Sequence, residues 1–364
     1  MACIAAASLL ASGASAQSQW MYSLVAPVEV EHDSNPKMRP GAAEAVTRLR
    51  VSPQLRALHR SGADEIHIDA VTVVERSSKE GLSGDRVDPR VRADWRRASA
   101  RTDYSVFGIF EQRSYRTLEA EEEVPLGVDG TRSLWALGAV ATHSLNERDT
   151  LAAEVRHDRV DFDAGAVSDY ELTAANLQFS HLVSERSSAY ATGTRQVYRP
   201  TGGTGPHTED SVSSGLVLGW RQSVSQALDW DASLGVANIS GLRDSSSLQG
   251  ALRVTWNMER LQASLDVSRR PSPIAESAAL GLSDFVRLQL RRLVDARSSL
   301  LVEANATRFA TGARGATYAI AFTHELAQAW SLTARVLHRQ REDAGGRASA
   351  NVIGLLLTYN DPDL

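Results

Sequence analysis

Apolar and polar residues alternate along most of this chain, and this alternation limits the folds that it can adopt. In residues 261–270, Leu261, Ala263, Leu265 and Val267 alternate with polar residues, and residues 248–257, 284–291 and 299–307 repeat the pattern. Successive side chains of a β-strand point to opposite faces, so each segment would form a strand with one apolar and one polar face. Helical spacing explains these segments less well, and the alternation therefore predicts an all-β protein.

Short and long connections alternate between the predicted strands. Short polar turns lie near residues 60–62, 100–101, 146–148, 185–186, 226–227, 259–260, 295–297 and 327–328. Longer segments, including 33–45, 114–130, 199–210 and 271–280, lie between them. Eight short turns divide the chain into nine hairpins, or about 18 strands, and this rhythm is typical of an outer-membrane β-barrel.

The composition agrees with a protein that crosses a membrane with strands. Hydrophobic residues make up 43% of the chain, yet beyond residue 16 no apolar run approaches the roughly 18 residues of a membrane helix. Lipid offers no hydrogen bonds, so the edges of a sheet cannot stay open there. We therefore predict a transmembrane antiparallel β-barrel.

Three prolines bear on the strand count. Pro27, Pro53 and Pro89 fall inside predicted strands, and proline removes a hydrogen-bond donor from the ladder. The prediction is thus about 18 strands, with about 16 as the alternative and a bulge or broken strand near these prolines.

The N-terminus predicts export. An apolar stretch from Ala2 to Ala11 is followed by Ala14-Ser15-Ala16, which fits a small-x-small cleavage site, although no Lys or Arg precedes it. A buried N-terminal helix is the alternative. We expect residues 1–16 to be a signal peptide and residues 17–364 to be a single outer-membrane β-barrel domain. Cys3 is the only cysteine, so the mature chain would have none.

Two soluble all-β folds would also show alternation. A β-sandwich of this length would need two domains, and no linker-like segment divides the chain. Its strands are also commonly about 5–6 residues long, which is shorter than the segments seen here. A solenoid would repeat similar sequence at a fixed period, and no such repeat is present. A membrane barrel therefore fits better than either soluble fold.

If the apolar faces of the strands meet lipid, the polar faces line the lumen. A barrel of this size leaves an aqueous channel, and charged rings along such a channel set its ion selectivity. Arginine-rich strands would favour anions or acidic sugars. Alternatively, the charges pair with one another, fix the strand register and hold water. The candidate pore-lining residues are Arg48, Arg50, Arg56, Arg90, Arg92, Asp94, Arg96, Glu154, Arg156, Asp158, Arg221, Arg253, Asp266, Arg287, Arg291 and Glu303.

The sequence carries no motif for catalysis or metal binding. There is no HExxH, cysteine cluster or GxSxG elbow. His143 and His181 lie beside short turns with a neighbouring serine, and we interpret them as residues of the membrane interface. The formal net charge of −5 argues against a nucleic-acid partner. We expect no cofactor, no metal and no enzymatic activity.

The start of the mature chain resembles a known family. Residues 28–35 read VEVEHDSN, a first strand that ends in an Asp-Ser-Asn turn, and Arg39 follows. This resembles the β-barrel porins encoded with exopolysaccharide gene clusters, which are similar in length, signal peptide, strand rhythm and lack of mature cysteine. Pro36 departs from the apolar residue that usually follows the asparagine. The resemblance implies a passage or scaffold for a polysaccharide, with periplasmic export components as partners.

Three functions follow as hypotheses. The first is a porin-like protein of exopolysaccharide biosynthesis or export. The second is a general small-solute porin, and the third is an outer-membrane enzyme acting on lipid or protein. In each case we expect the cell outer membrane as the location and its lipid as a partner. The N-terminus and short turns would be periplasmic, and the longer loops extracellular.

Overall fold

The fold is a single antiparallel sheet. The computed structural model describes residues 18–41, 43–115, 130–163, 167–202, 209–241, 244–274 and 279–361, so the predicted signal peptide lies outside the described residues. The strands are β1 (Gln19–Asp33), β2 (Val46–Val51), β3 (Gln54–Ser61), β4 (Asp64–Ser77), β5 (Arg86–Ala98), β6 (Thr102–Ser114), β7 (Thr131–Ser144), β8 (Asp149–Phe162), β9 (Tyr170–Ser184), β10 (Ser187–Pro200), β11 (Ser211–Ser223), β12 (Leu228–Ser240), β13 (Ser245–Asn257), β14 (Leu261–Ile274), β15 (Ala279–Leu293), β16 (Ser298–Phe309), β17 (Arg314–Ala327), β18 (Trp330–Asp343) and β19 (Gly346–Asp361).

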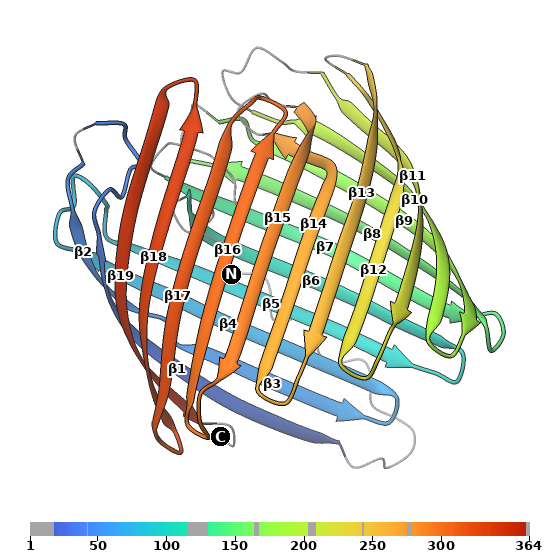
Figure 1. The fold of residues 1–364 in the computed structure, drawn as a ribbon, viewed down its shortest axis with the longest axis horizontal. Helices are drawn as coiled ribbons and strands as arrows, with labels where there is room; N and C mark the ends of the chain where they lie inside the picture. The colour runs from blue at the N-terminus through green and yellow to red at the C-terminus, as the bar shows by residue number, and fades with distance from the viewer. Residues whose placement is uncertain are drawn as a thin grey trace, which may run out of the picture.

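The sheet closes on itself. From β3 onward each strand pairs with the next one along the chain, and β1 pairs with β19 on one side and with β2 and β3 on the other. The first and last strands therefore lie side by side, and the chain forms the closed wall seen in Figure 1. Because β2 and β3 together cross the wall once, the barrel has 18 strands, as predicted.

The prolines explain why one crossing is divided. Ser52 and Pro53 separate β2 from β3, and Pro27 of β1 lies opposite, where its carbonyl accepts the Ser52 N–H at 3.0 Å. The register is the same on both sides, since Val28 pairs with Val51 and Val25 with Gln54. The prolines thus remove donors without shifting the strand. The interruption is a broken strand, not a bulge, and the count stays at 18.

Pro89 lies in line with this interruption. It pairs with Thr72 of β4, and the N–H of the same threonine donates to the Pro53 carbonyl at 3.1 Å. The β5–β6 ladder ends at Arg90, so Pro89 lies just beyond the last pair on that side. Proline is tolerated where a ladder ends, because no donor is required there.

The connections define two rims. Short turns at 62–63, 99–101, 145–148, 185–186, 224–227, 258–260, 294–297 and 328–329 form the short-turn rim, close to the predicted turns. The other connections form the loop rim, but towards the C-terminus they are no longer than the turns. The expected loop 271–280 is wrong at both ends, because β14 runs to Ile274 and β15 begins at Ala279. Pro271 and Pro273 suggested a loop. They are tolerated in β14 because its pairing with β13 ends at Arg269.

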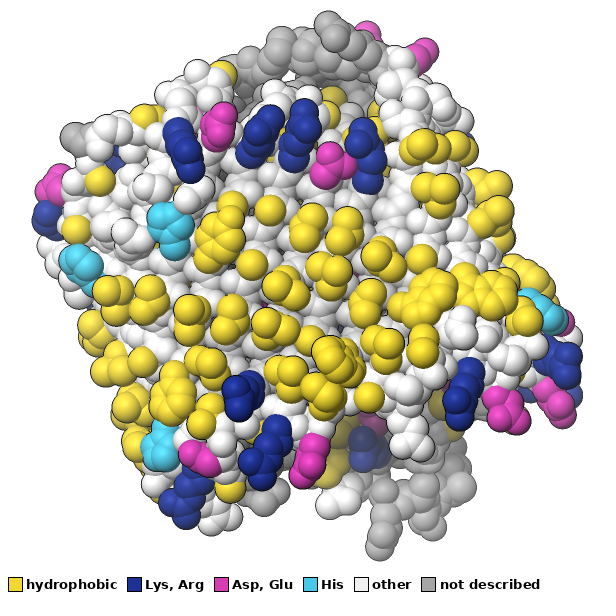
Figure 2. Space-filling model, viewed as in Figure 1, with side chains coloured by type: hydrophobic (Ala, Val, Ile, Leu, Met, Phe, Trp, Pro, Cys, Tyr) yellow, Lys and Arg dark blue, Asp and Glu magenta, His cyan; other side chains and the backbone are white. Residues whose placement is uncertain are grey.

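Apolar side chains cover the outside of the barrel. Figure 2 shows them as a broad belt, with Lys, Arg, Asp and Glu gathered above and below. Leu137, Leu218, Leu234 and Leu248 are each more than 60% exposed. A soluble protein would bury such residues, so the belt is the lipid-facing surface of a membrane barrel. Among the described residues, no helix has the length and apolarity needed to cross a membrane.

We predict that Leu234→Arg lowers the free energy of unfolding by about 2–4 kcal/mol, because arginine would meet the middle of the bilayer. Leu234 lies at the centre of β12 and is 64% exposed. The matched control is Ser240→Arg, on the same strand and face but at the loop rim, where the cost falls to about 0–1 kcal/mol. Urea unfolding in lipid vesicles measures both. Equal effects would contradict the assignment of the belt.

Candidate functional site: the barrel lumen

The strand register places every candidate pore-lining residue on the face opposite the apolar belt. Arg48 and Arg50, for example, alternate with Leu49, which is exposed on the belt. On later strands the candidates occupy corresponding positions across the ladder, as with Arg253 and Asp266. That these residues line a conducting channel stays a prediction, which is developed below.

One row of charges crosses five strands with alternating sign. Arg221 of β11 pairs in register with Asp231, Asp231 with Arg253, Arg253 with Asp266, and Asp266 with Arg287 of β15. The closest contacts are Arg221–Asp231 at 2.6 Å and Arg253–Asp266 at 2.5 Å. Opposite charges on directly facing residues stabilise strand pairing. The row therefore contributes to register as well as to the chemistry of the lumen.

Other candidates form separate pairs around the lumen. Arg56 contacts Asp69 at 3.1 Å, Arg92 contacts Asp94 at 2.7 Å, Arg96 contacts Asp103 at 3.3 Å and Arg156 contacts Asp158 at 2.6 Å. Glu154 and Glu303 accept hydrogen bonds from Asn176 at 3.4 Å and Gln289 at 2.8 Å. Arg90 is half-buried and Arg291 is exposed. The structure thus distributes these residues around the wall and does not gather them in one pocket.

The remaining candidates, Arg48 and Arg50, belong to a buried cluster of ion pairs that we call the lumenal ion cluster. Arg48 is fully buried and contacts Glu31 at 3.1 Å, Asp33 at 3.3 Å and Glu75 at 3.5 Å. Arg50 contacts Glu29 at 3.0 Å and Glu75 at 2.9 Å. These contacts join three successive crossings of the wall.

Arginines from both neighbouring sides complete the lumenal ion cluster. Arg335 of β18 contacts Glu29 at 2.7 Å, and Arg339 contacts Asp33 at 2.8 Å. Arg86 of β5 contacts Glu75 at 2.9 Å and Asp88 at 3.3 Å. The cluster therefore ties β18 to β1, β2, β4 and β5 across the place where the sheet closes. Its five guanidinium groups meet five carboxylates, so each buried charge has an opposite charge nearby.

Two connections of the loop rim lie near this cluster, one between β4 and β5 that carries Ser83 and one between β1 and β2 that carries Met38. Ser83 Oγ accepts a hydrogen bond from Arg48 Nε at 3.1 Å, and Met38 packs against Ala348 and Ala350. Asp85 lies in the same connection as Ser83 and fixes it to β4. Its carboxylate accepts hydrogen bonds from the Ser77 N–H at 2.8 Å and from Arg76 at 2.5 Å. These bonds, first of all the one from Ser77, keep the pKa of the Asp85 carboxyl below its ordinary value.

The residues of the VEVEHDSN motif have partners inside the barrel. Glu29, Glu31 and Asp33 supply three of the five carboxylates of the lumenal ion cluster. The Asn35 side chain donates to the Arg39 and Ser349 carbonyls, each at 3.0 Å, and accepts the Arg39 N–H at 3.1 Å. The motif is therefore accounted for by the closure of the barrel and by the turn that follows β1.

Aromatic side chains line the opposite side of the lumen near the loop rim. Ring contacts run from Tyr115 to Phe162, from Phe162 to Tyr170 and from Tyr170 to Tyr198, with centroids 4.9–6.1 Å apart. Tyr115 and Tyr198 are fully buried. One side of the mouth is thus charged and the other is aromatic.

Sequence reasoning missed several charged residues of the lumen. They are Glu29, Glu31, Asp33, Asp69, Glu75, Arg86, Asp88, Asp231, Arg335 and Arg339. Alternating charge was a usable signal, since residues 29, 31 and 33 are all acidic and follow the period of two. The pairing of each arginine with its carboxylate could not be predicted from the sequence, because β1 and β18 are about 300 residues apart.

The histidines singled out in the sequence form no Ser-His pair with their neighbours. His181 Nδ1 lies 2.7 Å from Asp149 Oδ1, and His143 Nδ1 lies 2.8 Å from Thr102 Oγ1. Ser180 and His181 point to opposite faces of β9 because they are adjacent in a strand. Within the described part of the chain, no group of three or more metal-ligating side chains is present. The lumen is thus a lining of paired charges, hydroxyls and aromatic rings.

A closed barrel with a lipid-facing belt and a polar lumen defines an outer-membrane β-barrel protein, located in the outer membrane of a Gram-negative cell. No protein-family model and no curated protein matches the chain. Solved structures match the chain in fold. The outer membrane protein OpdK from Pseudomonas aeruginosa superposes with a TM-score of 0.51 at 10% identity, over 94% of this chain and 98% of that one.

Two further solved structures share the fold. A BenF-like porin from Pseudomonas fluorescens gives a TM-score of 0.51 at 11% identity, covering 95% of this chain and 99% of that one. OpdO from Pseudomonas aeruginosa gives 0.51 at 12% identity, covering 94% and 97%. At these identities the likeness establishes a porin-like barrel architecture along almost the whole chain.

We predict that Arg48→Met destabilises the barrel by about 3–5 kcal/mol, because it leaves Glu31, Asp33 and Glu75 with less compensation in a buried site. Arg56→Met is the matched control, since Arg56 and Asp69 form an exposed pair worth about 0–1 kcal/mol. Urea unfolding in vesicles, followed by tryptophan fluorescence, compares the two. A loss for Arg48→Met no larger than that for Arg56→Met would show that the lumenal ion cluster does not hold the closure.

Proposed function

We propose that this protein is a passive outer-membrane channel for small solutes, with a preference for anions. The observation that carries the proposal is the unequal exposure of the two partners in the lumenal ion pairs. Arg253 is 70% exposed while Asp266 is 25% exposed, and Arg92 is 52% exposed while Asp94 is 25% exposed. Arg56, Arg156 and Arg221 are likewise more exposed than their aspartates.

The unequal exposure has a simple cause. An arginine side chain is longer than an aspartate side chain, so the guanidinium extends further from the wall while the carboxylate lies behind it. A solute in the lumen would meet the positive partner first, although the pairs are neutral overall. Charges that line a pore set its selectivity, and a wetted wall with many weak contacts allows passage without an energy source.

The comparisons favour a small-solute channel among the three hypotheses. One similar solved structure is described as a BenF-like porin, and another as the outer membrane protein OpdK. This supports a channel over an enzyme and a general porin over a dedicated polysaccharide exporter.

We predict that the purified protein conducts in planar bilayers and favours chloride over potassium. The double variant Arg221→Gln/Arg253→Gln should reduce the chloride preference by about two- to fivefold, the size of an exposed charge interaction. Asp266→Asn is the matched control and should raise that preference, because it unmasks Arg253. Reversal potentials in a potassium chloride gradient measure both. No conductance, or a cation preference unaffected by these changes, would overturn the proposal.

The exopolysaccharide role is the second candidate, and the VEVEHDSN resemblance supports it. An arginine-lined lumen would also suit an acidic polymer, with periplasmic export components as the implied partners. The contacts of Glu29, Glu31, Asp33 and Asn35 explain the motif without a polymer, however. This candidate therefore has less support than the small-solute channel.

Gene deletion separates the two candidates. We expect deletion to leave the amount of secreted polysaccharide unchanged while slowing uptake of small anions. Complementation with the wild-type gene is the control. A large loss of secreted polysaccharide that complementation restores would favour the second candidate instead.

A further inference from the structure

The wall of the barrel is open on one side of the loop rim. β13 pairs with β12 as far as Ser245, but its pairing with β14 stops at Gly250 opposite Arg269. Within the described strands, residues 270–274 of β14 have ladder partners in β15 and none in β13, and residues 279–282 of β15 have ladder partners in β14 and none in β16. Among the described strands, these two segments, which we call the β14–β15 tip, are attached to neither neighbouring strand.

The β14–β15 tip leans into the mouth of the barrel. β15 contacts β10 and β11, which are not its neighbours in the sheet. Leu280 is buried against Tyr198 of β10 and Ile239 of β12, and Leu282 packs against the same cluster. These contacts close the tip against the inner wall and leave a space behind it, towards the outside of the barrel.

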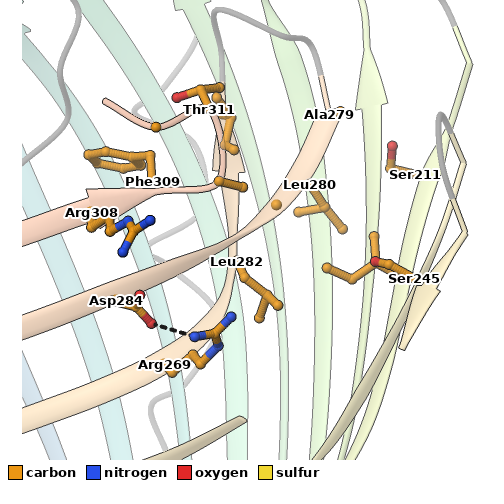
Figure 3. Close-up of a pocket in the computed structure, with 15 residues that line it drawn as sticks. Ser211, Ser245, Arg269, Ala279, Leu280, Leu282, Asp284, Arg308, Phe309 and Thr311 are labelled. Atoms are coloured by element: carbon orange, nitrogen blue, oxygen red, sulfur yellow. Dashed lines mark ion pairs between the residues drawn. The ribbon is translucent and has the colours of Figure 1, made fainter. Parts of the chain in front are cut away.

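That space is a cavity of about 640 Å³. It is bounded by β11, β12 and β13 on one side and by the β14–β15 tip and the end of β16 on the other. Its apolar lining includes Ile239, Ile274, Leu280, Leu282 and Phe309. Figure 3 shows the tip curving away from the wall, with Leu280 and Leu282 directed into the cavity. The volume lies within the range of about 300–1,000 Å³ that is usual for small-molecule sites.

Charged residues lie along the edge of the cavity nearest the apolar belt. Arg269 and Asp284 form an ion pair at 3.3 Å, with both side chains about half exposed. Arg308 pairs in register with Asp284, so two arginines flank one aspartate. Figure 3 shows Arg269 and Asp284 facing each other across their ion pair, with Arg308 on the neighbouring strand. The edge therefore carries an excess of one positive charge.

The cavity opens directly above the lipid-facing surface. Val267 and Val286 lie two residues along their strands from Arg269 and Asp284. The two valines pair with each other and are exposed on the belt. Backbone groups left without a sheet partner cannot face hydrocarbon, so the opening must lie at the level of the headgroups, where Arg269 and Arg308 also fit. Long connections of such barrels face the outside of the cell, so this is the outer leaflet.

We propose that this cavity binds a single-chain anionic amphiphile, such as a long-chain carboxylate. The hydrocarbon tail would occupy the apolar cavity, and the anionic head would lie at Arg269 and Arg308. Charge complementarity selects the head, and the apolar lining selects the tail. The opening between β13 and β14 would give such a ligand a lateral route between the mouth of the barrel and the membrane. The site is separate from the water-filled path proposed above.

Photolabelling tests the proposal on the mature protein in nanodiscs of neutral phosphatidylcholine. The probe is a dodecanoate analogue that carries a diazirine in its tail, and labelled peptides are mapped by mass spectrometry. We expect labelling to concentrate on the β14–β15 tip and the end of β16. Leu282→Trp, which fills the cavity, should lower it by about fivefold or more. Leu288→Trp is the matched control on the belt side of the same strand and should leave it unchanged.

A second pair of measurements tests the headgroup. The variant Arg269→Gln/Arg308→Gln should weaken competition by dodecanoate by about three- to tenfold, the size expected for one or two exposed ion pairs. Competition by dodecanol should be unchanged. If Leu282→Trp fails to insert, as judged by heat-modifiable migration, Ile274→Trp serves as the filling variant. Labelling spread evenly along the belt and insensitive to filling would overturn the site. Equal competition by the acid and the alcohol would overturn the anionic ligand.

Discussion

The pairing of β1 with β19 is the contact on which the rest of the structure depends. Every backbone donor and acceptor inside a bilayer needs a partner within the protein, and only a closed sheet provides one at each position. Ten residue pairs join the first strand to the last, from Leu24–Asp361 to Asp33–Val352. Closure at this place requires contacts across almost the whole length of the chain, and it cannot form until both ends are present.

The lumenal ion cluster lies beside that closure and explains how it is held. Glu29, Glu31 and Asp33 project from β1 towards arginines of the strands on both sides. Burying charge is costly, but here the guanidinium groups and carboxylates are matched within one network. The remaining lumenal charges follow a different rule. They lie as separate pairs along the wall, where the longer arginine side chains are more exposed than their aspartate partners.

The place where the wall loses the pairing between β13 and β14 also offers a second kind of surface. The β14–β15 tip gives up pairing with β13 and gains apolar contacts with Tyr198 and Ile239 inside the mouth. The same hairpin borders an apolar cavity that is open to the side. The polar lumen and the apolar cavity thus lie on opposite sides of the same hairpin.

The sequence by itself determined the all-β class and the alternation between two faces, and it favoured about 18 strands over 16, because these depend on a period of two and on the spacing of turns. It also identified Arg253 and Asp266 as residues of the polar face. It did not reveal that Glu31 meets Arg48 and Arg335, or that Pro27 and Pro53 share one interruption. Residues 271–280 looked like a loop, whereas residues 271–274 belong to β14 and residues 279–280 to β15. Only the tertiary structure decided these points, because they depend on which distant strands become neighbours and on where a ladder ends, and local patterning carries no record of either.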